Sequence, residues 1–202
     1  MRPLTGAGEI GIDWEGRTFI LRPSFYAMSE LGSPADIVAL FALMHTAPGT
    51  RAIRKQQFLM SLNVLYACAA EGDDISPIVG WITERNTYRP GAADPPTMLI
   101  LARALMRHGV QGDAEPAKGR QPSDEEYTAT FDARDYAALA VAHLGATERD
   151  AWAMTMTGFV AAMRAKFPSA EKAGDKAPSV QEHDETMAWL KRVNAARGAK
   201  HV

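Results

Sequence analysis

Helix-start signals recur along this chain of 202 residues, and they constrain its fold more than any other feature. In Ser33-Pro34-Ala35-Asp36, a capping serine precedes a proline that suits the first helical position and an acid that suits the positive helix end. Asp94-Pro95-Pro96, Asp132 and Thr147 open similar segments, and glycine or proline closes most of them. The pattern predicts a series of helices of ordinary length.

Apolar residues at helical spacing between these signals predict where the helices run. We expect helices over residues 25–31, 34–46, 51–70, 78–82, 95–108, 133–144, a short one from 147, then 157–167 and 179–197. Residues 9–22 differ, because Ile10, Ile12 and Trp14 alternate before a Glu15-Gly16 turn. This alternation predicts a β-hairpin, and an isolated hairpin is marginal in water, so we expect it to lie against helices.

The predicted fold class is mostly α. Residues 1–110 would form an α-rich domain with the hairpin packed on its helices. Residues 111–125, rich in glycine and proline, are predicted to be a linker. Residues 126–202 would form a small helical C-terminal module, and the sequence leaves open whether the two parts pack together.

The net charge, the single cysteine and the distribution of apolar residues exclude several classes of protein. The net charge of −2 gives no strong attraction to nucleic acid or to an acidic membrane. A single cysteine, Cys68, excludes an internal disulfide and sits among alanines, which predicts a buried free thiol. No segment approaches the roughly 20 apolar residues of a membrane helix, and residues 1–6 lack a signal-peptide pattern. We therefore expect a soluble cytoplasmic protein that does not bind membranes or nucleic acid.

No motif for catalysis is found. The five histidines form no zinc-type pair, and the sequence has neither a nucleophile elbow nor a phosphate-binding loop. His183 stands among Glu182, Asp184 and Glu185, but successive positions of a helix point in different directions. A basic cluster at Arg51, Arg54 and Lys55 lacks the interleaved aromatics of a nucleic-acid site. We expect no enzyme activity, no catalytic residue, no metal and no cofactor.

The block from Trp152 to Pro168 concentrates methionine and aromatic residues. It supplies the candidate partner-binding residues, which are Trp152, Met154, Met156, Phe159, Met163 and Phe167. Two interpretations stay open. Such a stripe could pack the core of the C-terminal module. Alternatively, because methionines adapt to varied partners and a module this short has little core, the block could be a docking surface.

Two segments carry a family resemblance. The hairpin over residues 8–22, running into Pro23-Ser24-Phe25 and followed by Leu31-Gly32-Ser33-Pro34, resembles the tail assembly chaperones of long-tailed, siphovirus-type phages. Residues 148–155, followed by Phe159 and Met163, look like the second module of such proteins. In the lambda-type system a programmed frameshift joins the two modules, whereas this chain carries both continuously.

The resemblance implies a protein that keeps the tape measure protein soluble and recruits tail-tube subunits, without catalysis. It implies the host cytoplasm as location, absence from the mature virion and possible self-association. Two alternatives remain. The chain could be a structural minor tail or connector protein of the virion, or a small phage protein that binds a host regulator.

Overall fold

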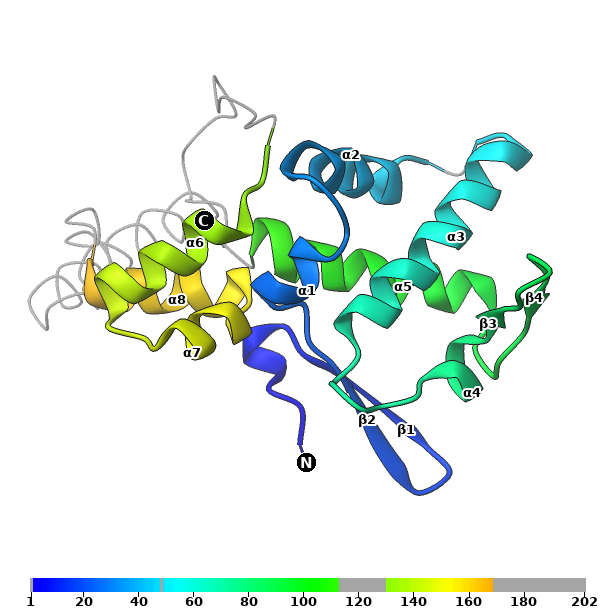
Figure 1. Ribbon diagram of the computed structural model, residues 1–202, viewed down its shortest axis with the longest axis horizontal. Helices are drawn as coiled ribbons and strands as arrows, with labels where there is room; N and C mark the ends of the chain where they lie inside the picture. Colours follow the sequence, from blue (N-terminus) through cyan, green and yellow to red (C-terminus); the bar gives the residue numbers. More distant parts are fainter. Residues whose placement is uncertain (1, 48, 113–129, 169–202) are drawn as a thin grey trace, which may run out of the picture. The chain divides into compact units, whose positions relative to one another are not determined.

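The computed structural model describes residues 2–47, 49–112 and 130–168, and it is mostly helical with a small hairpin near the N-terminus (Figure 1). Residues Met1–Lys166 form one compact unit. The mostly α fold with an N-terminal hairpin is thereby confirmed. The predicted linker is described only at residues 111–112, and the helix predicted over 179–197 lies outside the described residues.

The hairpin consists of β1 (Ile10–Trp14) and β2 (Arg17–Leu21), which pair antiparallel as predicted. A short 3₁₀ helix, η1 (Thr5–Ala7), precedes it. Both turn residues, Glu15 and Gly16, have positive φ, at 48° and 77°, which matches the twist of the flanking strands. The hairpin lies against helices, as expected, because Arg22 N donates to Cys68 O at 2.7 Å.

The helices of the first half are α1 (Phe25–Ser29), α2 (Pro34–His45), α3 (Arg51–Cys68) and α5 (Pro95–Met106). Each begins where the sequence predicted, because a capping side chain accepts a hydrogen bond from the backbone N–H three residues ahead. These capping residues are Ser24, Ser33, Thr50 and Asp94. Helices α3 and α5 pack along each other and form the centre of this half (Figure 1).

The helix predicted over residues 78–82 is wrong in its second half. Helix α4 (Ser76–Val79) ends at Gly80, and a small ribbon of β3 (Trp81–Ile82) and β4 (Tyr88–Arg89) follows. Gly80 has a φ of 75°, and a Cβ on it would lie 2.2 Å from Arg89 O. Its lack of a side chain therefore lets the chain leave the helix and the second strand return close to it.

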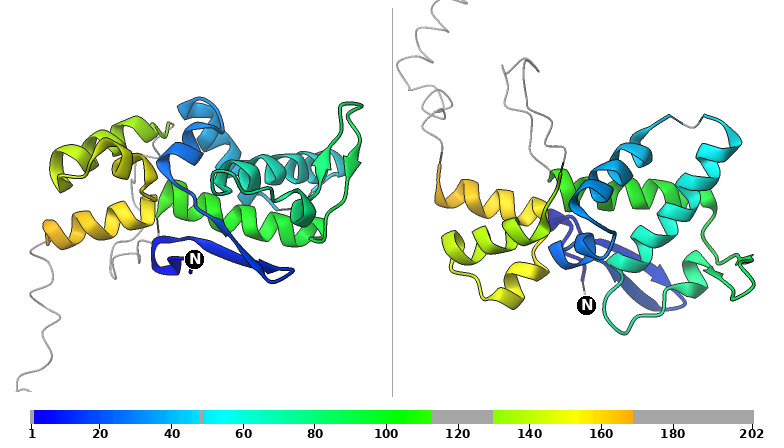
Figure 2. Two further views of the ribbon diagram at one scale, coloured as in Figure 1. Left: turned by 60° about the horizontal axis from the view of Figure 1, so that its bottom comes forward. Right: turned by 45° about the horizontal axis from the view of Figure 1, so that its top comes forward.

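The described C-terminal helices are α6 (Ala133–Leu139), α7 (Glu148–Ala153) and α8 (Met156–Lys166). One turn of π-helix extends α5 as η2 (Arg107–Gln111), and another extends α6 as η3 (Ala140–Leu144). Helices α6 and α7 pack on α1, and α8 packs on η2 (Figure 2). The part of the predicted C-terminal module up to Lys166 that the structure describes therefore shares one compact unit with the N-terminal half.

Aromatic rings join the two halves. Phe25, fully buried on α1, stacks on Tyr136 of α6 at 5.8 Å and meets Phe159 of α8 edge-on at 5.9 Å between ring centroids. Phe131 stacks on the same Tyr136 ring, and its backbone N–H donates to Pro34 O at 3.0 Å. Such rings contribute large buried area and favourable pair geometry, so this cluster fixes residues 131–166 against α1 and α2.

Candidate binding groove

The residues of the Met/aromatic block do not form one exposed stripe. Met156 and Phe159 are 3% and 6% exposed and belong to the core. Trp152, Met154 and Met163 are half-buried and pack against the core, whereas Phe167 is 53% exposed. The candidate set is thus divided between buried and exposed side chains, and the burial of Met156 and Phe159 favours the core interpretation for these two.

The polar residues of this block connect the two ends of the unit. Met154 O accepts from Phe25 N at 2.8 Å, and Thr155 Oγ1 donates to Ala7 O at 2.5 Å. Thr155 also caps α8, since its Oγ1 accepts from Gly158 N at 3.0 Å. His108 Nδ1 lies 2.9 Å from Thr157 Oγ1. Sequence reasoning missed this role, although two threonines in an apolar segment at a helix start were a usable signal.

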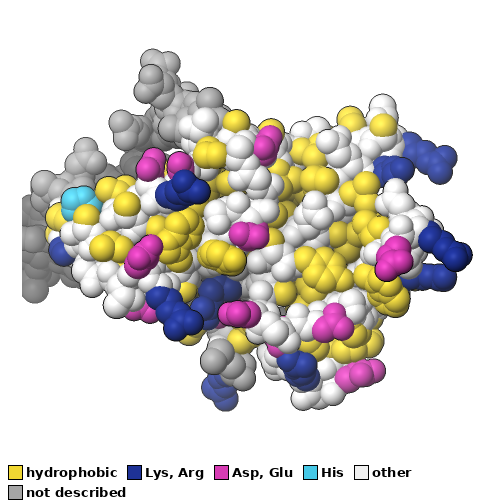
Figure 3. Space-filling view, in the orientation of Figure 1, with side chains coloured by type: hydrophobic (Ala, Val, Ile, Leu, Met, Phe, Trp, Pro, Cys, Tyr) yellow, Lys and Arg dark blue, Asp and Glu magenta, His cyan; other side chains and the backbone are white. Residues whose placement is uncertain are grey.

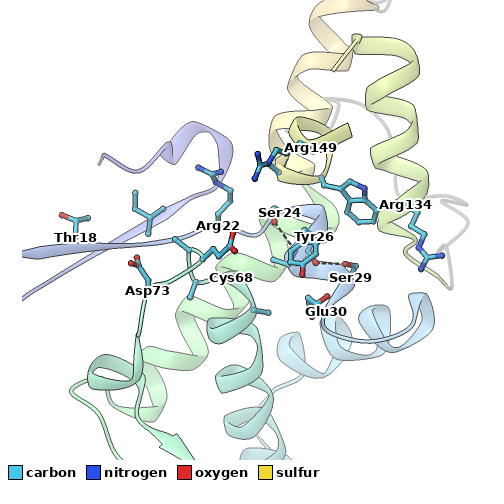
Figure 4. A pocket seen from close by; sticks show the side chains of 18 of the residues that line it. Thr18, Arg22, Ser24, Tyr26, Ser29, Glu30, Cys68, Asp73, Arg134 and Arg149 are labelled. Carbon is cyan, nitrogen blue, oxygen red and sulfur yellow. Dashed lines mark hydrogen bonds between the residues drawn. The ribbon is translucent and has the colours of Figure 1, made fainter. Parts of the chain in front are cut away.

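Next to the hydrogen bond between Phe25 and Met154 lies an open groove of about 1290 Å³. Its walls come from β2, α1, the C-terminal end of α3 with the loop that follows, α6 and α7. Figure 4 shows Tyr26, Arg134 and Arg149 toward one side of the groove, and Thr18 and Asp73 toward the other. Of the six candidate residues, Trp152 alone lines this groove.

Ion pairs fix the hairpin side of the groove. Arg17 pairs with Asp73 and lies over the Phe19 ring at 4.7 Å from its centroid. Arg22 Nε donates to Glu9 Oε1 at 2.5 Å, and the other carboxylate oxygen of Glu9 accepts from Leu4 N at 2.7 Å. Glu9 is only 4% exposed, so these partners compensate its loss of water. The two arginines are therefore occupied in holding the hairpin.

On the helical side of the groove, by contrast, the arginines are not held by ion pairs within the described residues. Arg134 on α6 and Arg149 on α7 are exposed, and neither forms an ion pair with any residue that the structure describes. Tyr26, 59% exposed, and the half-buried Trp152 line the same groove, and Glu30 is the acid on this side. Aromatic rings beside available guanidinium groups suit the binding of a protein segment with apolar and acidic side chains.

Cys68, which lines the groove, and His45, which does not, are both engaged in the fold. Cys68 is a free, buried cysteine, as predicted, and burial raises the pKa of its thiol far above the usual range. It is therefore a poor nucleophile. His45 stacks on Phe41 and its Nδ1 lies 2.9 Å from Phe41 O. Within residues 2–47, 49–112 and 130–168, no three metal-ligating side chains gather, and the cluster around His183 lies outside these ranges.

The described part of the chain is a small helical fold with a groove lined by aromatic and basic side chains. Residues 48–185 match the model of the family of unknown function DUF6246, so the chain belongs to that family. The matched region covers α3 to α8 but not the hairpin, α1 or α2. Neither the curated proteins nor the solved structures contain a match to this chain. Every helix in the described part is too short or too polar to cross a bilayer.

Proposed function

We propose that this protein is a phage tail assembly chaperone that keeps a tape measure protein soluble and recruits tail-tube subunits. The observation that carries the proposal is the contact between the two segments that bear the family resemblance. Residues 8–25 and 148–163 are far apart in sequence, yet Phe25 N donates to Met154 O and Ser24 forms an isolated bridge with Thr155. A resemblance split between two segments gains weight when the fold makes them one unit.

The groove is the surface on which this activity would take place. Tyr26 directly follows the first resembling segment, and Arg149 and Trp152 belong to the second, so both segments contribute walls. A long coiled-coil-forming client exposes apolar stripes flanked by charges until it assembles. Tyr26 and Trp152 would cover part of such a stripe, while Arg134 and Arg149 would meet its acidic residues.

The groove is open rather than enclosed, which suits transient contact with an extended client. One groove covers only a short length of a long chain, so many copies would bind along it. The tube subunits would be recruited by surfaces outside the groove. In this proposal the protein acts in the host cytoplasm and leaves before the virion matures.

Co-expression with the tape measure protein tests the proposal. We expect the soluble fraction of the tape measure to rise severalfold with this chain and to fall back with the double variant Tyr26→Ala/Trp152→Ala. Ile100→Ala is the matched control, because Ile100 is 64% exposed on α5 and does not line the groove. An unchanged solubility of the tape measure in the presence of the wild-type chain would refute the proposal.

Mass spectrometry of purified particles separates the proposal from the structural alternative. A chaperone should be absent from mature virions, whereas a minor tail or connector protein should be present at a fixed ratio to the tail proteins. Detection at such a ratio would overturn the chaperone role and favour the structural one.

A further inference from the structure

Strand β1 is the outer strand of the hairpin. The far edge of β2 is already engaged, because Ala70 N, in the chain after α3, donates to Ile20 O at 3.2 Å. The β2 residues from Phe19 to Leu21 are buried, whereas those of β1 are half-buried or exposed. The hairpin lies at the outside of the helices, with its turn projecting (Figures 1 and 2). The edge of β1 is therefore the edge at which this sheet can grow.

The register of the hairpin shows which backbone groups of β1 point outward. Trp14 stands opposite Arg17 across a two-residue turn, and the residues of such a pair exchange hydrogen bonds within the hairpin. Because bonded and non-bonded pairs alternate along two antiparallel strands, the N–H and C=O groups of Gly11 and Asp13 point away from β2. Both residues are exposed, and within the described part of the chain no hydrogen bond reaches these backbone groups. Gly11 and Asp13 therefore present donors and acceptors at the open edge.

The open stretch of β1 has a limit at each end. Before it, Glu9 N donates to Leu4 O at 3.2 Å, so the edge is covered there. After it, the chain turns at Glu15, which has a positive φ. The stretch between is Ile10–Trp14, five residues centred on Ile12. It contains neither proline nor lysine, and its pairing with β2 has no bulge, so it lacks features that commonly prevent an edge strand from pairing.

A second copy of β1 fits this stretch in one antiparallel register. When Gly11 of each copy stands opposite Asp13 of the other, the outward groups of both residues form hydrogen bonds across the new pair. Asp13 opposite Asp13 would instead place two carboxylates directly against each other, which is destabilising. Gly11 opposite Gly11 would place Asp13 against Glu9, whose N–H is already bonded to Leu4 O. The favoured register has a two-fold axis at Ile12, and it ends on both sides where the open stretch ends.

The same register joins the apolar faces of the two hairpins. Since side chains of a strand alternate between faces, Ile10, Ile12 and Trp14 share one face, on which they are only half-buried. Figure 3 shows apolar side chains among charged ones in the lower part of the view, where Figure 1 places the hairpin. In the paired strands, Trp14 of each copy stands opposite Ile10 of the other, and the two Ile12 side chains meet at the axis. On the other face, each Asp13 lies opposite a glycine and keeps its hydrogen bond from Thr18 Oγ1, at 2.6 Å.

From this fit we infer that the protein forms a symmetric dimer in which β1 pairs with β1 of a second copy, so that the two hairpins make one four-stranded antiparallel sheet. The interface is isologous, because each strand supplies the same residues to the other. Two short strands bury less than the about 1,200–2,000 Å² of a stable interface, so the dimer exchanges with the monomer. The groove stays open in the dimer, because β2 and not β1 lines it. The inference does not depend on the chaperone proposal.

Cysteine cross-linking of the full-length protein tests the register. The α-carbons of the two Ile12 residues would be about 4.5 Å apart, within the about 4.4–6.8 Å that a disulfide spans. Oxidation of Ile12→Cys with diamide should therefore give a disulfide-linked dimer. Asp13→Cys is the matched control, because position 13 is more exposed than position 12 but stands opposite Gly11 of the other copy. It should cross-link at least about tenfold more slowly, whereas random collision would favour it. The native Cys68 is buried in the fold.

Sedimentation equilibrium measures the association without a cross-link. Between about 10 and about 500 μM, we expect the average mass of the wild-type protein to rise from that of one chain toward that of two. Asp13→Pro removes an outward N–H and places a ring at the edge, so it should raise the dissociation constant at least about tenfold. Thr18→Val is the matched control: it removes the hydrogen bond to Asp13 but leaves the edge of β1 intact, and it should change the dissociation constant less than about twofold.

Three results would overturn the inference. A wild-type protein that stays monomeric over this range would leave the edge to a strand of a different protein. Cross-linking of Asp13→Cys as fast as that of Ile12→Cys would exclude the register. A dimer that persists in Asp13→Pro, when circular dichroism shows this variant to be folded, would assign self-association to another surface. If Asp13→Pro does not fold, the order of cross-linking in the two cysteine variants decides the question.

Discussion

Replacing Phe159 by alanine distinguishes a core role of the Met/aromatic block from a contact role. Phe159 is 6% exposed, and its ring meets Phe25 at 5.9 Å and Tyr136 at 5.8 Å, both edge-on. Truncating a buried phenylalanine costs about 3–5 kcal/mol in free energy of unfolding, and the lost edge-to-face pairs favour the upper part of that range. Because a domain of this size has only about 5–15 kcal/mol in total, Phe159→Ala should consume a large share of it.

Urea unfolding followed by circular dichroism measures this loss. With a denaturant slope of about 2 kcal/mol per molar, Phe159→Ala should lower the unfolding midpoint by about 1.5–2.5 M. Phe167→Ala is the matched control, since the same residue type stands in the same block but is 53% exposed. It should lower the midpoint by less than about 0.5 M. Equal shifts in the two variants, or a loss below about 1 kcal/mol for Phe159→Ala, would refute the assignment of Phe159 to the core.

Three further perturbations test other parts of the structure. Gly80→Ala should lower the free energy of unfolding, measured in urea, by more than about 2 kcal/mol, because a Cβ there would clash with Arg89 O. Gly145→Ala is its control: Gly145 also has a positive φ but open space around it, so the same change should cost about 1 kcal/mol. Arg103 donates hydrogen bonds to Met44 O and Thr46 O at the end of α2. Arg103→Met should therefore reduce the free energy of unfolding by about 1–3 kcal/mol and lower the melting temperature. An unchanged melting temperature would contradict this. Hydrogen bonds from Thr97 lower the pKa of Asp94 below its ordinary value of 3.8, so the stabilisation by this carboxylate is complete above pH 3.8 and is lost as the pH falls through the folded pKa. Asp94→Asn should therefore flatten the acid side of the stability profile, and identical profiles between pH 5 and 2 would disprove it.

The helix starts were predictable because their causes are local. Ser33 and Asp36 form a reciprocal capping box, and both partners lie within four residues of sequence. The hairpin turn was predictable for the same reason. The ribbon at Trp81–Arg89 was not, because the helix there stops through a close approach between Gly80 and Gly91. Periodicity alone cannot reveal such a contact between positions brought together by the fold.

The site was predictable in part. The sequence singled out Trp152, and the structure places it in the groove, but Tyr26, Arg134 and Arg149 went unrecognised. Exposed tyrosine and arginine residues are common on any surface and carry no local signature. They become a candidate site only because α1, α6 and α7 meet, and that meeting depends on contacts such as the one between Phe25 and Met154.

The same long-range contacts couple the groove to complete folding. Thr155 and Ala7, which share a hydrogen bond, are 148 positions apart, so the bond forms only after nearly all of the compact unit has been synthesised. Contacts of such separation form late, because the entropy of closing the intervening chain opposes them. Until then Phe25, which is fully buried in the folded state, lacks the Tyr136 and Phe159 rings that contact it. The walls from α1 and α7 therefore come together only in the finished fold, and an unfinished chain cannot form the complete groove.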